Sequence, residues 1–328
     1  MNGVPMRRVR YYEFGGPEVL KIEETDVPAP GPGQVLVKTE AIGTSWVDTT
    51  LRSGTSPLGQ PTLPGSPHGD VVGTVEAVGA GADPALAGVR VAALVNPDAY
   101  ADYVLADADW LVRVPAGVDA GTASVLDMPA PVALRVLRTG QLAAGETVLV
   151  HAAAGTIGHL ATQLARIEGA GTVIATASSK AKLEFAREHG ADVGVCYTEP
   201  DWPDQVRAAA PGGVDVVLET IGGQVTAQSL DLLAPFGRLV FYGAASGELP
   251  EVPVSRVLSL RTVSGFGLLA WRAARPEQAR QEVAELAGLA AAGRLRASVQ
   301  ATLPLEQAAR AHELLEDRDR MGRVLLVP

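Results

Sequence analysis

The pattern of apolar and polar positions changes near residue 126 and divides the chain into two kinds of region. From Arg8 to Val125, short apolar runs rich in β-branched residues are separated by glycine and proline, which is typical of short strands. From Leu126 onward, similar runs alternate with stretches in which apolar residues recur every three or four positions, the spacing of one helix face. The first region therefore predicts a compact β-rich domain with few helices. The second predicts an α/β domain, a parallel sheet covered by helices on both faces.

The pattern also places the individual elements. In the first region we expect strands at Val9–Tyr12, Gln34–Lys38, Val71–Val78, Val89–Leu94 and Tyr103–Leu105. In the second we expect strands at Thr147–Val150, Thr172–Thr176, Val193–Tyr197, Val214–Glu219, Arg238–Gly243 and Thr262–Leu268, with a helix at Gln224–Leu233. Two later helices, Glu277–Ala292 and Leu305–Leu315, precede a last strand, Arg323–Val327, which we expect to pair with the first region. Right-handed crossovers turn the second region into a Rossmann doubly wound sheet, with ligand at the carboxyl ends of its strands.

The loop after the strand Thr147–Val150 has the composition of a phosphate-binding turn. It reads Ala152-Ala153-Ala154-Gly155-Thr156-Ile157-Gly158 and leads directly into a helix. The first turn of a helix has unpaired N–H groups and binds phosphate when the backbone can approach closely. Gly155 permits the tight turn and Gly158 lets the helix lie near the strand. Alanine replaces the first glycine of GxGxxG, so a loop that merely packs tightly is the alternative.

The end of the second strand, Thr172–Thr176, indicates which dinucleotide is bound. An enzyme specific for NAD places an acidic residue here, on the 2′-hydroxyl of the ribose. This chain instead has Ser178, Ser179 and Lys180, and hydroxyl and ammonium groups are what a 2′-phosphate requires. Only four lysines stand among the chain's 27 basic residues, yet Lys180 and Lys182 both occur at this point. The sequence therefore favours NADPH, the alternative being an ordinary helix start capped by Ser179.

Length and charge limit the remaining classes of function. A chain of 328 residues predicts two domains. Its net charge of −10 argues against nucleic acid or an anionic membrane as partner. The single cysteine, Cys196, excludes a disulfide framework and a multi-cysteine metal site. Without an apolar segment in residues 1–12 or an apolar run of 18 residues, we expect a cytoplasmic protein with no membrane partner.

An ordered set of motifs then resembles a known family. These are AIGTSWVDTTLRSG at 41–54, GDVVGTVEAVG at 69–79, AYADYVL at 99–105, LVRVPAGV at 111–118, HAAAGTIG at 151–158, GVDVVLETIGG at 213–223, and the segment 235–243. The chain resembles a zinc-free medium-chain dehydrogenase/reductase of the quinone oxidoreductase, or zeta-crystallin-like, branch. It is also similar to the enoyl reductase domains of polyketide synthases. The resemblance covers nearly all of the sequence.

The resemblance implies a domain plan and a cofactor site. A GroES-like catalytic domain would comprise 1–125 and 269–328, and a Rossmann NADPH-binding domain 126–268, with substrate in the cleft between them. A homodimer would form edge to edge through the strand near Val263. The cofactor positions implied are Ala154, Gly155, Thr156, Ile157 and Gly158 at the pyrophosphate, Ser178, Ser179 and Lys180 at the 2′-phosphate, Tyr197 beside the adenosine ribose, Tyr242, Gly243 and Ala244 after the fifth strand, and Phe266 near the nicotinamide.

The residues expected to help catalysis depart from the family's pattern. Zinc-dependent relatives need an early cysteine and the histidine of a GHE motif. Here Thr44 or Ser45 stands at the first place, and His68 is one residue out of register. We therefore expect no metal, and His68 is read as a loop histidine. The candidate catalytic residues are Ser45 and Thr50, which replace the family's asparagine and tyrosine, and Asp48, whose alternative role is to brace the loop.

Hydride transfer to a quinone or to an α,β-unsaturated carbonyl needs no metal. The acceptor takes hydride at an electron-poor carbon, and the resulting enolate needs a hydrogen-bond donor and then a proton. The sequence thus predicts an NADPH-dependent quinone or enone reductase acting on small molecules. Two alternatives stay open: a pathway-specific enoyl reductase of polyketide or other secondary metabolism, and a non-catalytic NADPH-binding protein.

Overall fold

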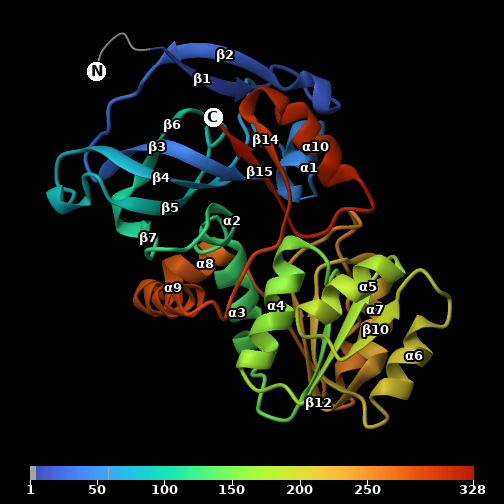
Figure 1. Cartoon of the computed structure of the whole chain (residues 1–328). Coiled ribbons are helices and arrows are strands. Elements are labelled where there is room, and N and C mark those ends of the chain that lie inside the picture. Colours follow the sequence, from blue (N-terminus) through green and yellow to red (C-terminus); the bar gives the residue numbers. More distant parts are fainter. Residues whose placement is uncertain (1–4, 58) are drawn as a thin grey trace. The chain divides into compact units, whose positions relative to one another are not determined.

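The computed structural model describes residues 5–57 and 59–328. The described residues form two compact units, one from 5–57 and 59–128 with 280–328 and the other from 129–279 (Figure 1). The first unit is therefore built from two separate segments, whereas the second is continuous. The predicted boundaries were 125/126 and 268/269, whereas the two units divide at 128/129 and 279/280, and the role of each domain remains a prediction.

The first unit is dominated by a mixed, mainly antiparallel sheet. Its path runs β14-β15-β3-β4-β5-β7, with β6 paired to β3, and a separate ribbon joins β1 and β2. The bounds are β1 Pro5–Arg10, β2 Lys21–Asp26, β3 Gln34–Gly43, β4 Gly69–Val78, β5 Arg90–Val95, β6 Tyr103–Asp107, β7 Val112–Arg113, β14 Val299–Pro304 and β15 Arg323–Val327. Strand β15 pairs with β3 in antiparallel register, which confirms that the last strand completes the first region.

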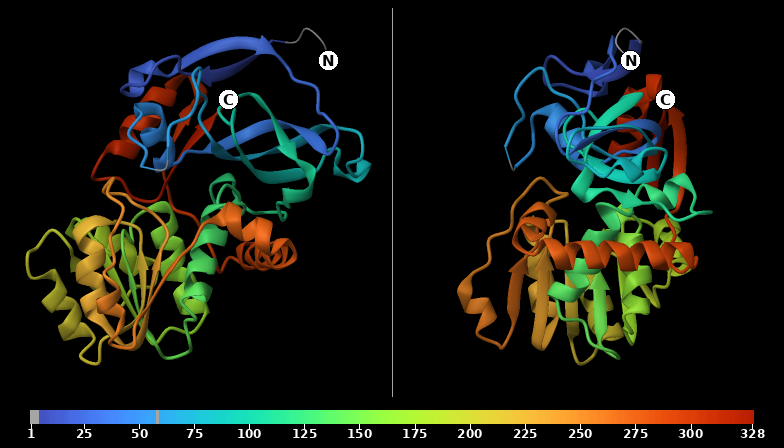
Figure 2. Two further views of the ribbon diagram at one scale, coloured as in Figure 1. Left: turned by 180° about the vertical axis from the view of Figure 1, so that it is seen from behind. Right: turned by 90° about the vertical axis from the view of Figure 1, so that its left-hand side faces the viewer.

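Helices of the first unit are few, as expected, but the pattern did not predict α1 (Trp46–Ser53). The hydroxyl of Ser45 caps α1, and Gly54, with a φ of 74°, ends it in the left-handed conformation. The further helices are α2 Ala120–Ala123, α9 Pro276–Ala291, which is one continuous helix in Figure 2, and α10 Ala308–Glu316. The predicted helix at Leu305 begins three residues later, because Leu305–Gln307 forms a 3-10 turn. Buried side chains of α10 (Ala308, Ala311, Leu315) join the core formed by β3, β4 and β5.

The second unit is a parallel six-stranded sheet among the described residues, in the order β10-β9-β8-β11-β12-β13. This is the 3-2-1-4-5-6 order of a Rossmann fold, so the predicted arrangement is confirmed. The bounds are β8 Thr147–Val150, β9 Thr172–Ala177, β10 Val193–Cys196, β11 Val214–Glu219, β12 Leu233–Phe241 and β13 Thr262–Gly265. The predicted strand 262–268 is too long, since Gly267 breaks it and α8 (Leu268–Ala274) begins. The predicted strand 238–243 begins earlier than expected, at Leu233, and ends at Phe241.

Helices cover both faces of this sheet (Figures 1 and 2). Helix α3 (Pro129–Thr139) packs on α4 (Thr156–Ile167), whose His159 ring meets Phe185 of α5 (Lys180–Glu188). Helices α6 (Trp202–Ala209) and α7 (Gly223–Leu232) form a second group. In a sheet of this kind, ligands bind where the carboxyl ends of the strands meet. None of the helices formed by residues 5–57 and 59–328 is both long and apolar enough to cross a membrane.

Candidate functional site

The glycine loop of the second unit, which joins β8 to α4, allows almost no substitution at its last glycine. A Cβ atom on Gly158 would lie 2.2 Å from the carbonyl oxygen of Ala152 and 2.7 Å from Cα of Ala153. Ala152 already adopts a left-handed φ of 49°. Gly155 is the N-cap residue of α4 and has no side chain to accept hydrogen bonds from the first-turn N–H groups. Those N–H groups suit the pyrophosphate of a dinucleotide.

His151, the first residue of the motif HAAAGTIG, holds the start of this loop in place through hydrogen bonds. The two ring nitrogens of His151 lie 2.8 Å from the hydroxyls of Thr176 and Ser229. The ring is completely buried, and burial lowers the pKa of His151 to about 3, so the imidazole is neutral. His151 thus ties β8, β9 and α7 together and has no exposed atom with which to take part in chemistry.

The residues predicted at the 2′-phosphate gather at the end of β9. Ser179 caps α5, its Oγ accepting the N–H of Lys182 at 3.5 Å, and Lys180 is exposed at the first position of the helix. Lys182 was not among the predicted site residues, yet its Nζ donates to Ser178 Oγ at 3.1 Å. The signal that could have found it is its spacing, one helical turn after Ser178. Two ammonium groups and two hydroxyls therefore surround the place where an NAD enzyme would have a carboxylate.

The other predicted cofactor residues lie along the same edge of the sheet. The N–H of Tyr197 donates to Ala177 at 3.1 Å, that of Tyr242 to Glu219 at 2.9 Å, and that of Phe266 to Phe241 at 2.9 Å. Each residue is thus fixed just beyond the carboxyl end of a strand. Gly243 and Ala244 follow Tyr242, and a Cβ on Gly243 would lie 2.4 Å from the hydroxyl of Thr220. The structure brings these residues to the edge where the fold binds ligands, and their individual contacts remain predictions.

A buried acid at this edge, Glu219, was missed. Its carboxylate accepts the N–H of Ile221 at 2.6 Å, the N–H of Gly222 at 3.1 Å and the hydroxyl of Thr226. The pKa of Glu219 is raised, chiefly by burial, and these hydrogen bonds offset only part of the rise. The pKa of the Tyr242 phenol is raised, first by its own burial and then by the charge of Glu219. Glu219 therefore shapes the loop after β11, which carries the second half of the GVDVVLETIGG motif.

In the first unit, the three predicted catalytic residues lie at or on α1. Ser45 Oγ accepts the N–H of Val47 at 3.3 Å, and Thr50 Oγ1 donates to the carbonyl of Val47 at 2.8 Å. Both hydroxyl oxygens thus form a hydrogen bond with the backbone of Val47, Ser45 as acceptor and Thr50 as donor. Asp48 is only 2% exposed, and its Oδ1 accepts the N–H of His68 at 2.8 Å. This contact corresponds to the bracing role, with His68 in the loop that leads into β4.

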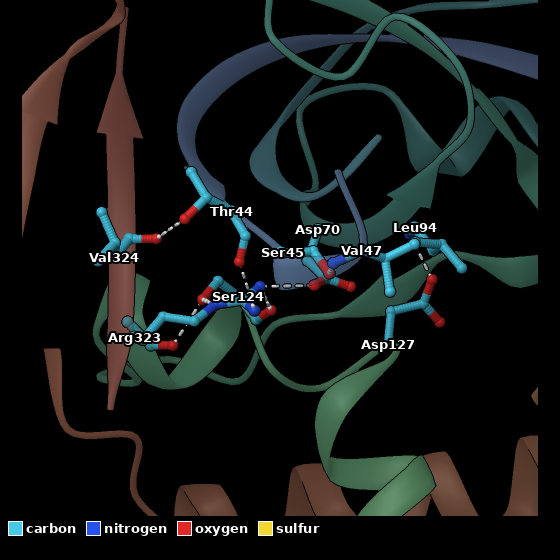
Figure 3. Close-up of polar contacts among 10 residues, drawn as sticks. Thr44, Ser45, Val47, Asp70, Leu94, Ser124, Asp127, Arg323 and Val324 are labelled. Carbon is cyan, nitrogen blue, oxygen red and sulfur yellow. Dashed lines mark hydrogen bonds and ion pairs between the residues drawn. The ribbon is translucent and has the colours of Figure 1, made fainter. Parts of the chain in front are cut away.

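Beside α1, a buried ion pair joins the last strand to the middle of the sheet (Figure 3). Arg323 and Asp70 are each 1% exposed, and Arg323 Nη2 lies 2.5 Å from Asp70 Oδ2. The same guanidinium donates to the carbonyl of Ser124 at 3.0 Å and to that of Thr44 at 3.3 Å. Thr44 Oγ1 in turn donates to the carbonyl of Val324 at 2.9 Å. The network fixes the backbone that leads into α1, so it sets the position of Ser45.

The donor set near α1 does not suit a catalytic zinc ion. Zinc prefers thiolate and imidazole ligands in a tetrahedral arrangement. Here Ser45 offers a hydroxyl, Asp48 is bonded to a backbone N–H, and Asp70 is paired with Arg323. Within residues 5–57 and 59–328, no group of three or more histidine, cysteine, aspartate or glutamate side chains is arranged to hold a metal ion.

The fold combines a Rossmann sheet that has a glycine loop with a β-rich unit built from two segments of the chain. This combination identifies the class of protein to which the chain belongs. Residues 31–116 match the family described as "Alcohol dehydrogenase GroES-like domain", and residues 156–288 match that described as "Zinc-binding dehydrogenase". The chain belongs to the medium-chain dehydrogenase/reductase superfamily, in its quinone oxidoreductase branch. Its assignment from the sequence motifs is thereby confirmed.

Particular relatives are similar over nearly their whole length. A quinone oxidoreductase of Pseudomonas aeruginosa is 35% identical, with 98% of this chain and 99% of the relative covered. A 2-haloacrylate reductase of a Burkholderia species is 36% identical, with 97% of each covered. The solved structure of the Escherichia coli quinone oxidoreductase complexed with NADPH has a TM-score of 0.90 and 30% identity, over 98% of this chain and 100% of that one.

Proposed function

We propose that this protein is an NADPH-dependent oxidoreductase that transfers hydride to a quinone or an α,β-unsaturated carbonyl compound without a metal ion. The observation that carries the proposal is the end of β9, where Ser178, Ser179, Lys180 and Lys182 replace the carboxylate of NAD enzymes. The NADPH complex of the Escherichia coli relative supports the same cofactor. The names of two relatives, one a quinone oxidoreductase and one a 2-haloacrylate reductase, support both types of acceptor.

The residues of the second unit have defined tasks in this proposal. The first-turn N–H groups of α4, at Thr156 to Gly158, hold the pyrophosphate, and the hydroxyls and lysines after β9 hold the 2′-phosphate. Tyr197, Tyr242, Gly243, Ala244 and Phe266 line the rest of the dinucleotide. When bound, NADPH supplies the hydride and both electrons. The protein's share is to orient the acceptor and to exclude water from it, which requires few dedicated side chains.

The test of the function is NADPH oxidation by the purified protein with a panel of acceptors: ortho- and para-quinones, simple enones, 2-halogenated unsaturated acids and 2-enoyl thioesters. Turnover with quinones or small enones and acids supports the proposal. Turnover only with thioesters assigns the protein to biosynthetic enoyl reduction instead. Tight NADPH binding with no turnover on any acceptor contradicts catalysis altogether.

The two lysines after β9 are expected to make the protein bind NADPH more tightly than NADH. Lys182→Ala and Lys180→Ala should each weaken NADPH binding by about 1.5–3 kcal/mol, because each removes a charged hydrogen bond to the 2′-phosphate. NADH, which lacks that phosphate, should bind as before. Isothermal titration calorimetry with both dinucleotides measures the difference, and Lys38→Ala, in β3 of the other unit, is the matched control. Equal losses for NADPH and NADH would contradict this assignment.

We also propose a cytoplasmic homodimer formed through β13. This strand lies at the edge of the parallel sheet, so its outer hydrogen-bonding groups can pair with a second copy. Large apolar side chains nearby are exposed: Phe236 at 70%, Val254 at 77%, Leu258 at 78% and Leu260 at 57%. An exposed apolar patch of this kind is typical of a subunit interface.

Leu258→Glu is expected to raise the dimer dissociation constant at least about 100-fold, because it would bury an unpaired carboxylate in the interface. Sedimentation velocity over a concentration series gives that constant. Val299→Glu, which changes an exposed apolar residue of β14 in the other unit, should leave it unchanged. A protein that is monomeric before mutation, or a Leu258→Glu variant that dimerises normally, would refute the edge-to-edge interface.

A further inference from the structure

His159 is a polar residue buried in the first turn of α4, next to the glycine loop. Its side chain is completely buried. A buried imidazole is costly unless its nitrogens form hydrogen bonds, because burial removes them from water. Nδ1 of His159 lies 2.8 Å from the carbonyl oxygen of Gly155, the residue that precedes the helix. Since a carbonyl oxygen can only accept, Nδ1 carries a proton and is the donor.

The carbonyl of Gly155 therefore accepts two hydrogen bonds from the same residue. The backbone N–H of His159 donates to it at 3.1 Å, which is the ordinary first hydrogen bond of the helix, and the ring adds the second. Glycine has more conformational freedom than any other residue, and Gly155 has no side chain with which to cap α4. The ring of His159 thus restrains a backbone position that has no side-chain cap of its own.

This restraint acts on one of the N–H groups assigned to the dinucleotide. The carbonyl of Gly155 and the N–H of Thr156 belong to one planar trans peptide group, so they point in opposite directions. Holding the carbonyl toward the body of α4 therefore directs the N–H of Thr156 away from the helix, to the side on which its first turn binds an anion. His159 acts on this N–H through the peptide group, because its own ring is buried behind the loop.

The other printed face of the ring packs against α5 and makes contacts that do not require a donor. Its centroid lies 5.8 Å from that of Phe185 and 5.1 Å from that of His189, with interplanar angles of 64° and 78°. Any aromatic ring can form edge-to-face contacts of this kind. Nδ1 of His189 donates to the carbonyl of Phe185 at 2.6 Å, at the end of α5. Packing against α5 and the hydrogen bond to Gly155 are therefore separable by substitution.

We propose that His159 is a positioning residue for the dinucleotide, whose Nδ1–H holds the peptide group between Gly155 and Thr156 in the orientation that binds the pyrophosphate. The proposal rests on the proposed function, which assigns the pyrophosphate to this loop. Without the ring donor, the loop spends part of its time in other arrangements, and the apparent affinity falls by the fraction that remains competent to bind. NADPH and NADH both contain a pyrophosphate, so both should lose affinity equally, in contrast to changes of the lysines after β9.

The first experiment is calorimetric titration of three variants with NADPH and with NADH. His159→Phe keeps a ring against α5 but has no donor, so both dissociation constants should rise about 10-fold. His159→Asn loses the ring but keeps a donor, because the amide nitrogen of asparagine takes the place of Nδ1, and its affinities should stay within about 2-fold of the original. His189→Phe is the matched control, since it keeps a ring beside His159 and removes only the donor to Phe185. It should bind both dinucleotides as the original protein does.

Three results of this titration would overturn the positioning role. They are an unchanged affinity of His159→Phe, an equal loss in His189→Phe, and a loss in His159→Asn as large as that in His159→Phe. Thermal melting without dinucleotide shows whether each variant is folded. If His159→Phe does not fold, His159→Leu, which is smaller and also has no donor, takes its place in the same comparison.

Steady-state kinetics distinguish positioning of the dinucleotide from damage to the rest of the protein. With the best acceptor, His159→Phe should raise the KM for NADPH and leave kcat at saturating NADPH unchanged, because saturating dinucleotide restores the competent loop. A lower kcat with an unchanged KM contradicts the proposal. The titrations need no acceptor, so the two hypotheses fail separately. A protein that reduces no acceptor refutes the proposed function, whereas the calorimetric comparison alone decides the role of His159.

Discussion

Arg323→Met is expected to lower the free energy of unfolding of the first unit by about 3–5 kcal/mol, the typical cost of removing one partner of a buried ion pair. Asp70 is 1% exposed and would lose the guanidinium with which it forms its buried ion pair. The carbonyls of Thr44 and Ser124 would also lose their donor. Methionine is chosen because it fills a similar length of the space with an apolar chain. Urea unfolding followed by far-ultraviolet circular dichroism measures the loss.

A double variant shows whether the loss of stability comes from the charge of Asp70 that Arg323 no longer neutralises. Arg323→Met combined with Asp70→Asn removes both charges, so a large part of the stability should return. Arg310→Met is the matched control, because Arg310 pairs with Glu313 on the surface of α10, with both side chains at least half exposed. That pair should contribute only about 0.3–0.5 kcal/mol. An Arg323→Met loss as small as that of Arg310→Met would show that the buried pair contributes little.

Gly158→Val is the second change with a large expected effect, and it acts on the cofactor site. The new Cβ would clash with the carbonyl oxygen of Ala152 at 2.2 Å, and only movement of the backbone can relieve the clash. The start of α4 would then be displaced from the loop, and its N–H groups would no longer point at the pyrophosphate. We expect NADPH affinity to fall at least about 100-fold, equivalent to about 2.7 kcal/mol, the loss of one or two charged hydrogen bonds.

Fluorescence titration with NADPH measures this affinity, and far-ultraviolet circular dichroism reports whether the sheet is intact. Gly288→Ala is the control for the loss of a glycine, since Gly288 is exposed on α9 and an added Cβ meets nothing within 4 Å. It should leave NADPH binding unchanged and raise stability by about 0.5–1 kcal/mol through helix propensity. Undiminished NADPH binding by Gly158→Val would show that the loop does not hold the dinucleotide.

Much of the fold could be predicted because the determining signals are local. Strands such as β8 and β15 are short apolar runs bounded by turns, and their predicted limits agree with the structure. Alternating strands and helices joined by right-handed crossovers predicted the Rossmann arrangement of the parallel sheet. Helix α1 was missed because the residues that it buries are polar (Asp48, Thr49 and Arg52), although Ser45 before it and Gly54 after it are the residues that commonly begin and end helices.

The parts of the site that could not be predicted depend on contacts between distant positions. Nothing local to Asp70 shows that Arg323 neutralises it, since 252 residues lie between them. His68 was read as an ordinary loop histidine because the motif in which it stands is out of register, and only the folded backbone brings its ring to Asp48. Lys182 lies two residues after the predicted Lys180. It is Lys182 that donates to Ser178, because of the direction of its side chain at the start of α5.

The place of β15 in the first sheet has a consequence for biosynthesis. It lies between β14 and β3, and it carries the cation that neutralises Asp70. While the ribosome is still translating codon 322, Ile42 and Gly43 at the end of β3 therefore lack their pairing with β15, and Asp70 lacks the guanidinium of Arg323, although the contiguous Rossmann unit has already been synthesised. Nascent chains should thus pass through a stage in which the Rossmann unit is folded, whereas the first unit still lacks its last strand and can be bound by chaperones.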